Sequence, residues 1–152
     1  MRNLRTLPDY GTSLYRIVVG FLMACHGAST LFAFPVRSSG GHTVSPTVWP
    51  GGVAAVLQLT FGVLVLAGLW TRVSAVLLSG TMAYAYFSVH QEKALLPMAN
   101  GGEPAALFSW AFLSIAMLGA GPLSLDAVLA RVRRGPGVGA GGSDAEPVTA
   151  VA

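Results

Sequence analysis

Charged side chains are scarce in this sequence of 152 residues: Asp, Glu, Lys and Arg make up 10% of the chain, whereas apolar residues make up 53%. Soluble domains carry about 25% charged residues. The chain therefore has too few charges to cover a surface that faces water. This composition excludes an ordinary soluble domain and predicts that lipid surrounds most of the protein.

Cysteine is nearly absent as well, since Cys25 is the only one in the chain. A single cysteine forms neither an intramolecular disulfide nor a Cys-x-x-Cys redox pair, which excludes the thiol-relay enzymes of membranes. The sequence also lacks a glycine-rich phosphate loop, two histidines spaced for a metal or haem on one helix, and a nucleophile with an adjacent base. We therefore expect no metal site and no catalysis by the chain alone.

Apolar residues are concentrated in four blocks, each close to the roughly 20 residues that a helix needs to cross a bilayer. The blocks comprise residues 12–34, 51–69, 73–89 and 104–121. Backbone amides in lipid must bond internally, and four strands are too few to close a barrel, so the blocks predict helices. Short connections favour antiparallel neighbours. The predicted fold is an all-α membrane protein, a four-transmembrane-helix up-and-down bundle within residues 1–134, with a disordered cytoplasmic tail at 135–152.

The basic residues predict the orientation of this bundle. Seven of them fall on one side of the four-span arrangement: Arg2, Arg5, Arg16, Arg72, Arg131, Arg133 and Arg134. Only Arg37 and Lys93 fall on the other side. Because cytoplasmic loops are enriched in Lys and Arg, both termini are expected in the cytoplasm, in a multi-pass protein of the plasma (inner) membrane. The first block is long for a signal peptide and predicts an uncleaved helix. The net charge of +3 thus needs no nucleic-acid partner.

Polar and aromatic residues in the outer half of the predicted bundle indicate a pocket between the helices. They are His26, Gln58, Tyr86, His90, Glu103 and Trp110. His26 and Gln58 lie at similar depths, roughly 10–12 Å below the outer helix ends. Two interpretations stay open: the two side chains bond to each other as structural glue, or they bind a ligand. A ligand that suits these donors, acceptors and flat walls is a neutral, ring-bearing amphiphile such as a quinone headgroup.

At the inner side, charged residues predict structural contacts rather than chemistry. Arg16, Arg72 and Asp126 are expected to form an ion-pair cluster in which Asp126 pairs with one of the two arginines. After Asp126, a brief amphipathic turn ends in three arginines, which we expect to lie against anionic lipid headgroups.

Several short motifs at the helix ends, taken in order, resemble the DoxX family from about Leu14 to Arg134. The motifs are Arg16-Ile-Val-Val-Gly20, His26-Gly27, Gly68-Leu-Trp-Thr-Arg72, His90 at the end of the third block, Asn100-Gly-Gly-Glu103 and Gly121-Pro-Leu-Ser-Leu-Asp126. The sequence departs from the family pattern at two positions. Thr30 stands where Lys often follows the His-Gly pair, and Gln58 stands where Glu is common. A neutral pair thus replaces a charged one between the first two helices.

The resemblance implies a four-helix membrane subunit associated with quinone-linked redox proteins and oxidative-stress complexes. The leading expectation is a membrane anchor or scaffold that docks redox-enzyme partners and binds a quinone or a similar lipid-soluble ligand. The alternative is a small-molecule carrier or permease that uses the outer pocket. The lipid bilayer is the expected partner in either case, and the sequence leaves a homo-oligomer open.

Overall fold

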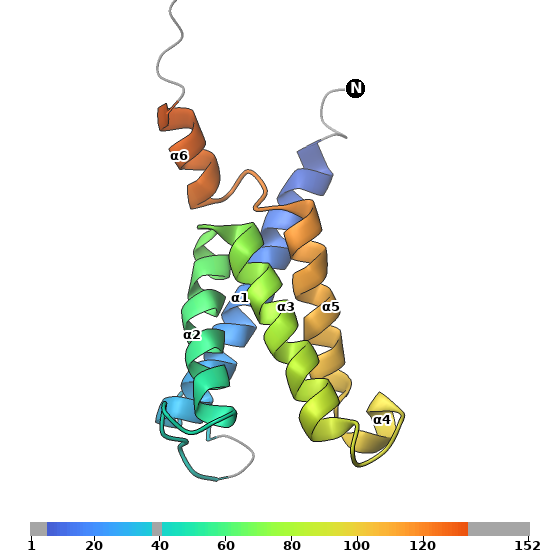
Figure 1. The fold of residues 1–152 in the computed structure, drawn as a ribbon. Helices are drawn as coiled ribbons and strands as arrows, with labels where there is room; N and C mark the ends of the chain where they lie inside the picture. The colour runs from blue at the N-terminus through green and yellow to red at the C-terminus, as the bar shows by residue number, and fades with distance from the viewer. Residues whose placement is uncertain (1–5, 38–40, 134–152) are drawn as a thin grey trace, which may run out of the picture.

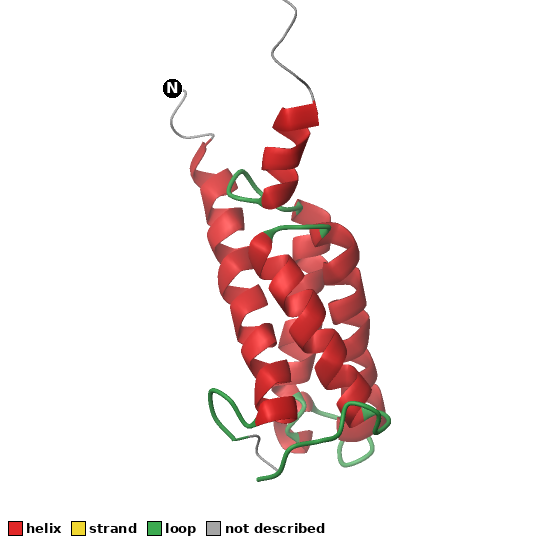
Figure 2. Ribbon diagram, turned by 90° about the vertical axis from the view of Figure 1, so that its left-hand side faces the viewer, coloured by secondary structure: helices red, strands yellow, loops and turns green. Residues whose placement is uncertain are grey.

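The computed structural model describes residues 6–37 and 41–133, and in these ranges the chain is helical with no strand (Figure 2). The all-helical prediction is confirmed. The elements are α1 (Thr6–Phe32), α2 (Gly51–Ala67), α3 (Thr71–Ala85), the π-helical segment η1 (Tyr86–His90), α4 (Pro97–Asn100), α5 (Glu103–Leu118) and α6 (Leu125–Arg133). The predicted tail at 135–152, together with Arg2, Arg5 and Arg134, lies outside the described residues.

Four long helices, α1, α2, α3 and α5, run side by side and form the body of the molecule (Figure 1). The start of α1 and the whole of α6 lie at one end, which we call the α6 end. The loop before α2 and the short helix α4 lie at the opposite end, the α4 end. The four predicted apolar blocks coincide with these four helices to within a few residues, apart from the earlier start of α1.

The helices associate as two pairs, α1 with α2 and α3 with α5, joined mainly through α2 and α3. Glycines bring the first pair very close. A Cβ atom added at Gly20 would come within 2.6 Å of the Leu66 amide nitrogen, and one added at Gly27 within 2.5 Å of the Leu59 amide nitrogen. Small residues on one face of α1 thus allow backbone-to-backbone packing, as in membrane helix pairs.

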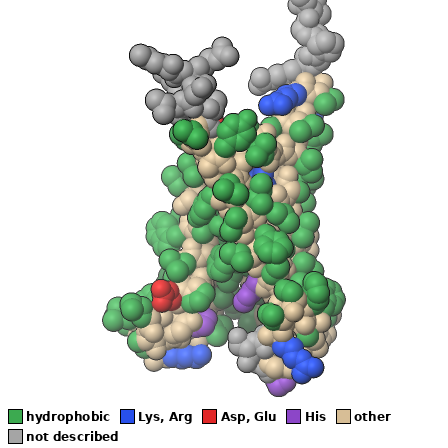
Figure 3. Space-filling view, turned by 180° about the vertical axis from the view of Figure 1, so that it is seen from behind, with side chains coloured by type: hydrophobic (Ala, Val, Ile, Leu, Met, Phe, Trp, Pro, Cys, Tyr) green, Lys and Arg blue, Asp and Glu red, His purple; other side chains and the backbone are tan. Residues whose placement is uncertain are grey.

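The core between the pairs is apolar, while many large apolar side chains face outward. Met23, Val65, Leu78, Phe112 and Ile115 are fully buried in the centre. On the outer surface, apolar side chains cover the middle of the molecule, and most charged side chains gather toward its two ends (Figure 3). Apolar patches of this extent mark contact with a membrane or a partner protein.

The helices differ in how well they would cross a bilayer alone. Within the described residues, one helix segment, Leu7–Phe32, is both long and apolar enough to do so by length and composition. Helices α2 and α5 are apolar but contain 17 and 16 residues. Helix α3 has 15 residues and continues directly into the 5 residues of η1. At 1.5 Å per residue, the shorter helices span roughly 24–30 Å.

Candidate functional site

A cavity of about 330 Å³ lies between the two helix pairs toward the α4 end. Residues from all four long helices, from η1 and from the η1–α5 connection line it: His26, Gln58, Met82, Ala85, His90, Gly101, Pro104, Ala105 and Phe108. In the space-filling view, histidine side chains lie beside the notch that divides the molecule at the α4 end (Figure 3). The cavity is therefore mainly apolar, with three polar side chains and no formally charged acid or base among its lining residues, which is typical of small-molecule sites.

Gln58 supplies a buried amide to this cavity from the middle of α2. Its side chain is 6% exposed, and its amide nitrogen lies 3.8 Å from the sulfur of Met82, a weak acceptor. Within the described residues, the amide oxygen has no hydrogen-bond partner. The group therefore keeps most of its hydrogen-bonding capacity for a ligand.

His26 faces the same cavity from α1. Its backbone carbonyl accepts a hydrogen bond from the Thr30 hydroxyl at 3.1 Å, but its ring nitrogens have no hydrogen-bond partner among the residues described. Within residues 6–37 and 41–133, no hydrogen bond thus joins the His26 and Gln58 side chains as a structural contact between the two helices. Both side chains line one space instead of bonding to each other.

His90 is held in place by the chain that follows it. Its Nδ1 lies 3.2 Å from the carbonyl oxygen of Asn100, and because a carbonyl only accepts, Nδ1 is the donor in this contact. Nε2 of the neutral ring then remains an acceptor. Asn100 is itself fixed, since its side chain donates to the Ala94 carbonyl at 2.8 Å and accepts from the Gly102 amide at 2.7 Å.

Local backbone features explain this arrangement. The π-helical turn is closed by a hydrogen bond of 2.9 Å from the Gln91 amide to the Tyr86 carbonyl, and such turns occur frequently at functional sites. Gly102 must be small, because an added Cβ would lie 2.7 Å from the Cβ of His90 and 2.8 Å from the Tyr86 ring. The Asn-Gly-Gly motif therefore closes the α4 end of the cavity.

The structure places the other three predicted residues outside this cavity. Tyr86 and Trp110 border a separate hollow, and the Tyr86 hydroxyl donates to the Leu95 carbonyl at 3.3 Å. Glu103 is exposed in the first turn of α5, where the helix dipole favours a carboxylate, and it borders another hollow. Of the six predicted residues, His26, Gln58 and His90 share the cavity.

The rotation of α5 accounts for the position of Trp110. Ser109 faces α3, because its hydroxyl donates to the Ser79 carbonyl at 3.1 Å and its carbonyl accepts from the Ser79 hydroxyl at 2.9 Å. The next residue points about 100° away around the helix. Trp110 is consequently 70% exposed on the outer surface.

Arg16 forms the centre of a second polar cluster, at the α6 end. Its side chain is completely buried and donates to four backbone carbonyls: Val65 at 2.5 Å, Leu66 at 2.6 Å, Leu123 at 2.5 Å and Ala120 at 2.8 Å. Two of these carbonyls belong to the last turn of α2, and the other two follow the end of α5. Cations favour helix C-termini, where carbonyls lack intrahelical partners. Arg16 thus caps the C-terminus of α2 and joins it to the connection between α5 and α6.

The contacts of the Asp126 carboxylate differ from the ion pair with Arg16 or Arg72 that the sequence predicts. The carboxylate accepts hydrogen bonds from the Trp70 amide at 3.0 Å, the Thr71 amide at 3.1 Å and the Thr71 hydroxyl at 3.0 Å. The carboxylate therefore caps the N-terminus of α3. The first amides of a helix have no partner within the helix, and here they bind the carboxylate in place of a guanidinium. Among the described residues, no hydrogen bond joins Asp126 to an arginine. The exposed Arg72 lies over Gly119, whose added Cβ would be 3.5 Å from its guanidinium.

A family model described as DoxX matches residues 11–91. An uncharacterized protein of Haemophilus influenzae is 37% identical over 131 residues, covering 83% of this chain and 96% of that protein. No solved structure matches the chain. The family match spans α1 to η1 and includes Arg16, His26, Gln58 and His90. The chain belongs to the DoxX family, a family of membrane-associated proteins.

Proposed function

We propose that this protein is a four-span membrane subunit that binds a neutral, ring-bearing, lipid-soluble molecule, such as a quinone headgroup, between its two helix pairs. The observation that supports the proposal is the cavity of about 330 Å³ shared by His26, Gln58 and His90. The family resemblance favours a role as an anchor or scaffold for redox-enzyme partners, with any redox chemistry carried out together with those partners.

The lining of the cavity favours a neutral ligand over an ion. An ion would lose its hydration in a space lined largely by apolar atoms, which costs several kcal/mol without a charged partner. The available partners are two imidazoles and one amide, which can bond to the carbonyl or hydroxyl groups of a ring. Phe108 and Met82 add apolar contact surface, and Met sulfur packs well against rings.

The outer surface supports placement across the membrane. Side chains such as Val18, Phe21, Val76 and Leu107 are 47%, 54%, 55% and 62% exposed at mid-helix. In the described ranges, four arginines lie at the α6 end, whereas Arg37 and Lys93 lie at the α4 end. The positive-inside rule then puts the α6 end and both termini in the cytoplasm, and the plasma (inner) membrane is the proposed location.

Cysteine labelling tests this orientation. In a Cys25→Ala background, a cysteine at exposed Thr43 should react with a membrane-impermeant maleimide in intact cells, and one at exposed Val132 should react only after lysis. The Cys25→Ala protein without an added cysteine is the labelling control. Labelling of the Val132 position in intact cells would show that the α6 end is not cytoplasmic.

Identification of a retained ligand tests the binding proposal. We expect protein purified in mild detergent to contain about one ring-bearing, lipid-soluble molecule per chain, detected by solvent extraction and mass spectrometry. A DoxX-unrelated membrane protein from the same cells should lack this enrichment. Absence of any such molecule, together with substrate flux in liposomes, would reject the proposal in favour of the carrier alternative.

A further inference from the structure

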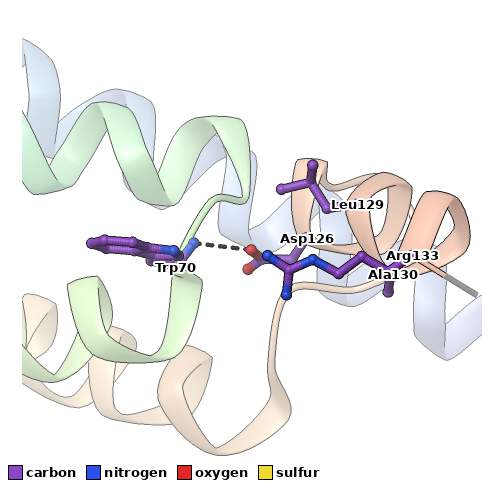
Figure 4. Close-up of a pocket in the computed structure, with 5 residues that line it drawn as sticks. All are labelled: Trp70, Asp126, Leu129, Ala130 and Arg133. Carbon is purple, nitrogen blue, oxygen red and sulfur yellow. Dashed lines mark hydrogen bonds between the residues drawn. The ribbon is translucent and has the colours of Figure 1, made fainter.

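The α6 end contains a hollow of about 360 Å³ that is separate from the ligand cavity. It is lined by Trp70, Asp126, Leu129, Ala130 and Arg133. Trp70 comes from the turn between α2 and α3, while the other four residues belong to α6. Figure 4 shows the Arg133 side chain running back along α6 toward Asp126, with the Trp70 ring on the other side of the carboxylate. The hollow therefore lies between a helix that leaves the bundle and the turn beneath it.

Helix α6 is attached firmly at its first turn. The Ser124 hydroxyl accepts a hydrogen bond from the Ala127 amide at 3.1 Å, and the Asp126 amide donates to the Gly68 carbonyl at 2.9 Å. The carboxylate of Asp126 is bonded to Trp70 and Thr71. Beyond these contacts, no residue of Leu125–Arg133 is buried. The base of the hollow is thus fixed, and the remainder of α6 is exposed.

The exposed part of α6 is strongly amphipathic. At 100° per residue, its large apolar side chains fall within a sector of about 100°. They are Leu125, Val128, Leu129 and Val132, exposed by 46%, 50%, 45% and 72%. Arg133 lies at one border of this sector and Arg131 toward the other. Helices with an apolar face bordered by basic residues lie in the membrane interface.

The charges around the hollow favour an anion. Asp126 is the only acid among its lining residues, and three hydrogen bonds from the N-terminus of α3 already compensate its charge. The guanidinium of Arg133 makes no hydrogen bond to any other described residue. Its planar donors match two phosphate oxygens. Trp70 is 72% exposed, and an indole in this position is typical of headgroup depth.

We propose that this hollow binds the headgroup of one anionic phospholipid. Arg133 donates to the phosphate, the Trp70 ring packs against the glycerol region, and the apolar face of α6 contacts the upper acyl chains. The occupant is a lipid rather than a soluble anion, because the charged group and the exposed apolar face are adjacent on one helix. No residue of the His26 cavity takes part, so the site is independent of quinone binding.

Titration with single lipids in detergent tests the headgroup site. Native mass spectrometry of the full chain with short-chain phosphatidylglycerol should show saturable binding of one molecule, at least about fivefold tighter than phosphatidylcholine. Arg133→Gln should weaken the phosphatidylglycerol complex about fivefold or more. Arg131→Gln, the matched control on the same helix, should change it less than about twofold. Unchanged melting temperatures in both variants show that the fold is intact, since neither position is buried.

Three results would overturn the headgroup site. Equal weakening by Arg131→Gln and Arg133→Gln would mean diffuse attraction to a basic helix. Equal affinity for the two lipids would mean that the hollow does not select a headgroup with a net negative charge. Displacement of the lipid by inorganic phosphate at the same concentration would mean that the hollow recognises a free anion.

Discussion

Replacing Arg16 with methionine is expected to lower the free energy of unfolding by about 3–5 kcal/mol, because it leaves several buried carbonyls unsatisfied at roughly 1–3 kcal/mol each. Methionine keeps an apolar stem of similar length but has no donors. The carbonyls of Val65, Leu66, Ala120 and Leu123 would then lose the guanidinium that satisfies them. Where water is excluded, a carbonyl that loses its donor cannot bond to solvent instead, and the folded state is destabilised.

Thermal denaturation in detergent measures this effect. A loss of this size should lower the melting temperature by roughly 10 °C and reduce the yield of monodisperse protein. Arg72→Met is the matched control, because Arg72 is exposed and should cost less than about 1 kcal/mol. Arg16→Lys should fall between the two, since an ammonium has three donors and cannot reproduce the planar fork. If Arg16→Met melts at the same temperature as Arg72→Met, the contacts that join the end of α2 to the α5–α6 connection through Arg16 do not stabilise the fold.

Replacing His26 with leucine is expected to weaken ligand binding by about 10–100-fold, the loss that follows when a buried hydrogen bond of roughly 1–3 kcal/mol is removed. The effect should fall on binding rather than on stability, because the imidazole makes no hydrogen bond within the described part of the chain. Gln58→Leu should weaken binding to a similar extent. The two losses should not add fully if both side chains bond to the same ring.

The helices could be predicted from the sequence because its apolar residues occur in four blocks, each close to the length that a helix needs to cross a bilayer. The four apolar blocks therefore coincide with α1, α2, α3 and α5. The π-helical segment η1 and the short helix α4 were not predicted. A single turn leaves no periodic pattern in the sequence, and the contact of His90, the last residue of η1, with Asn100 joins residues that are ten positions apart.

The cavity could be predicted in part for a related reason. Depth follows from counting residues along a helix of known rise, which predicts similar depths for His26 and Gln58, and both side chains line one cavity in the structure. Rotation about the helix axis is set by packing partners that the sequence does not identify. The bonds between Ser79 and Ser109 turn Trp110 outward, against expectation. The capping role of Arg16 could not be predicted, because its partners are backbone carbonyls, which every residue possesses.

The binding of a short-chain benzoquinone to the purified protein is the most direct test of the central claim. Its dissociation constant should be measured in one detergent for the unsubstituted chain, His26→Leu and the matched control His42→Leu, whose histidine is exposed in the loop before α2. We expect saturable binding of one molecule, retained by His42→Leu and weakened about 10–100-fold by His26→Leu with no change in melting temperature. Equal dissociation constants for all three proteins would contradict binding in the cavity between the helix pairs.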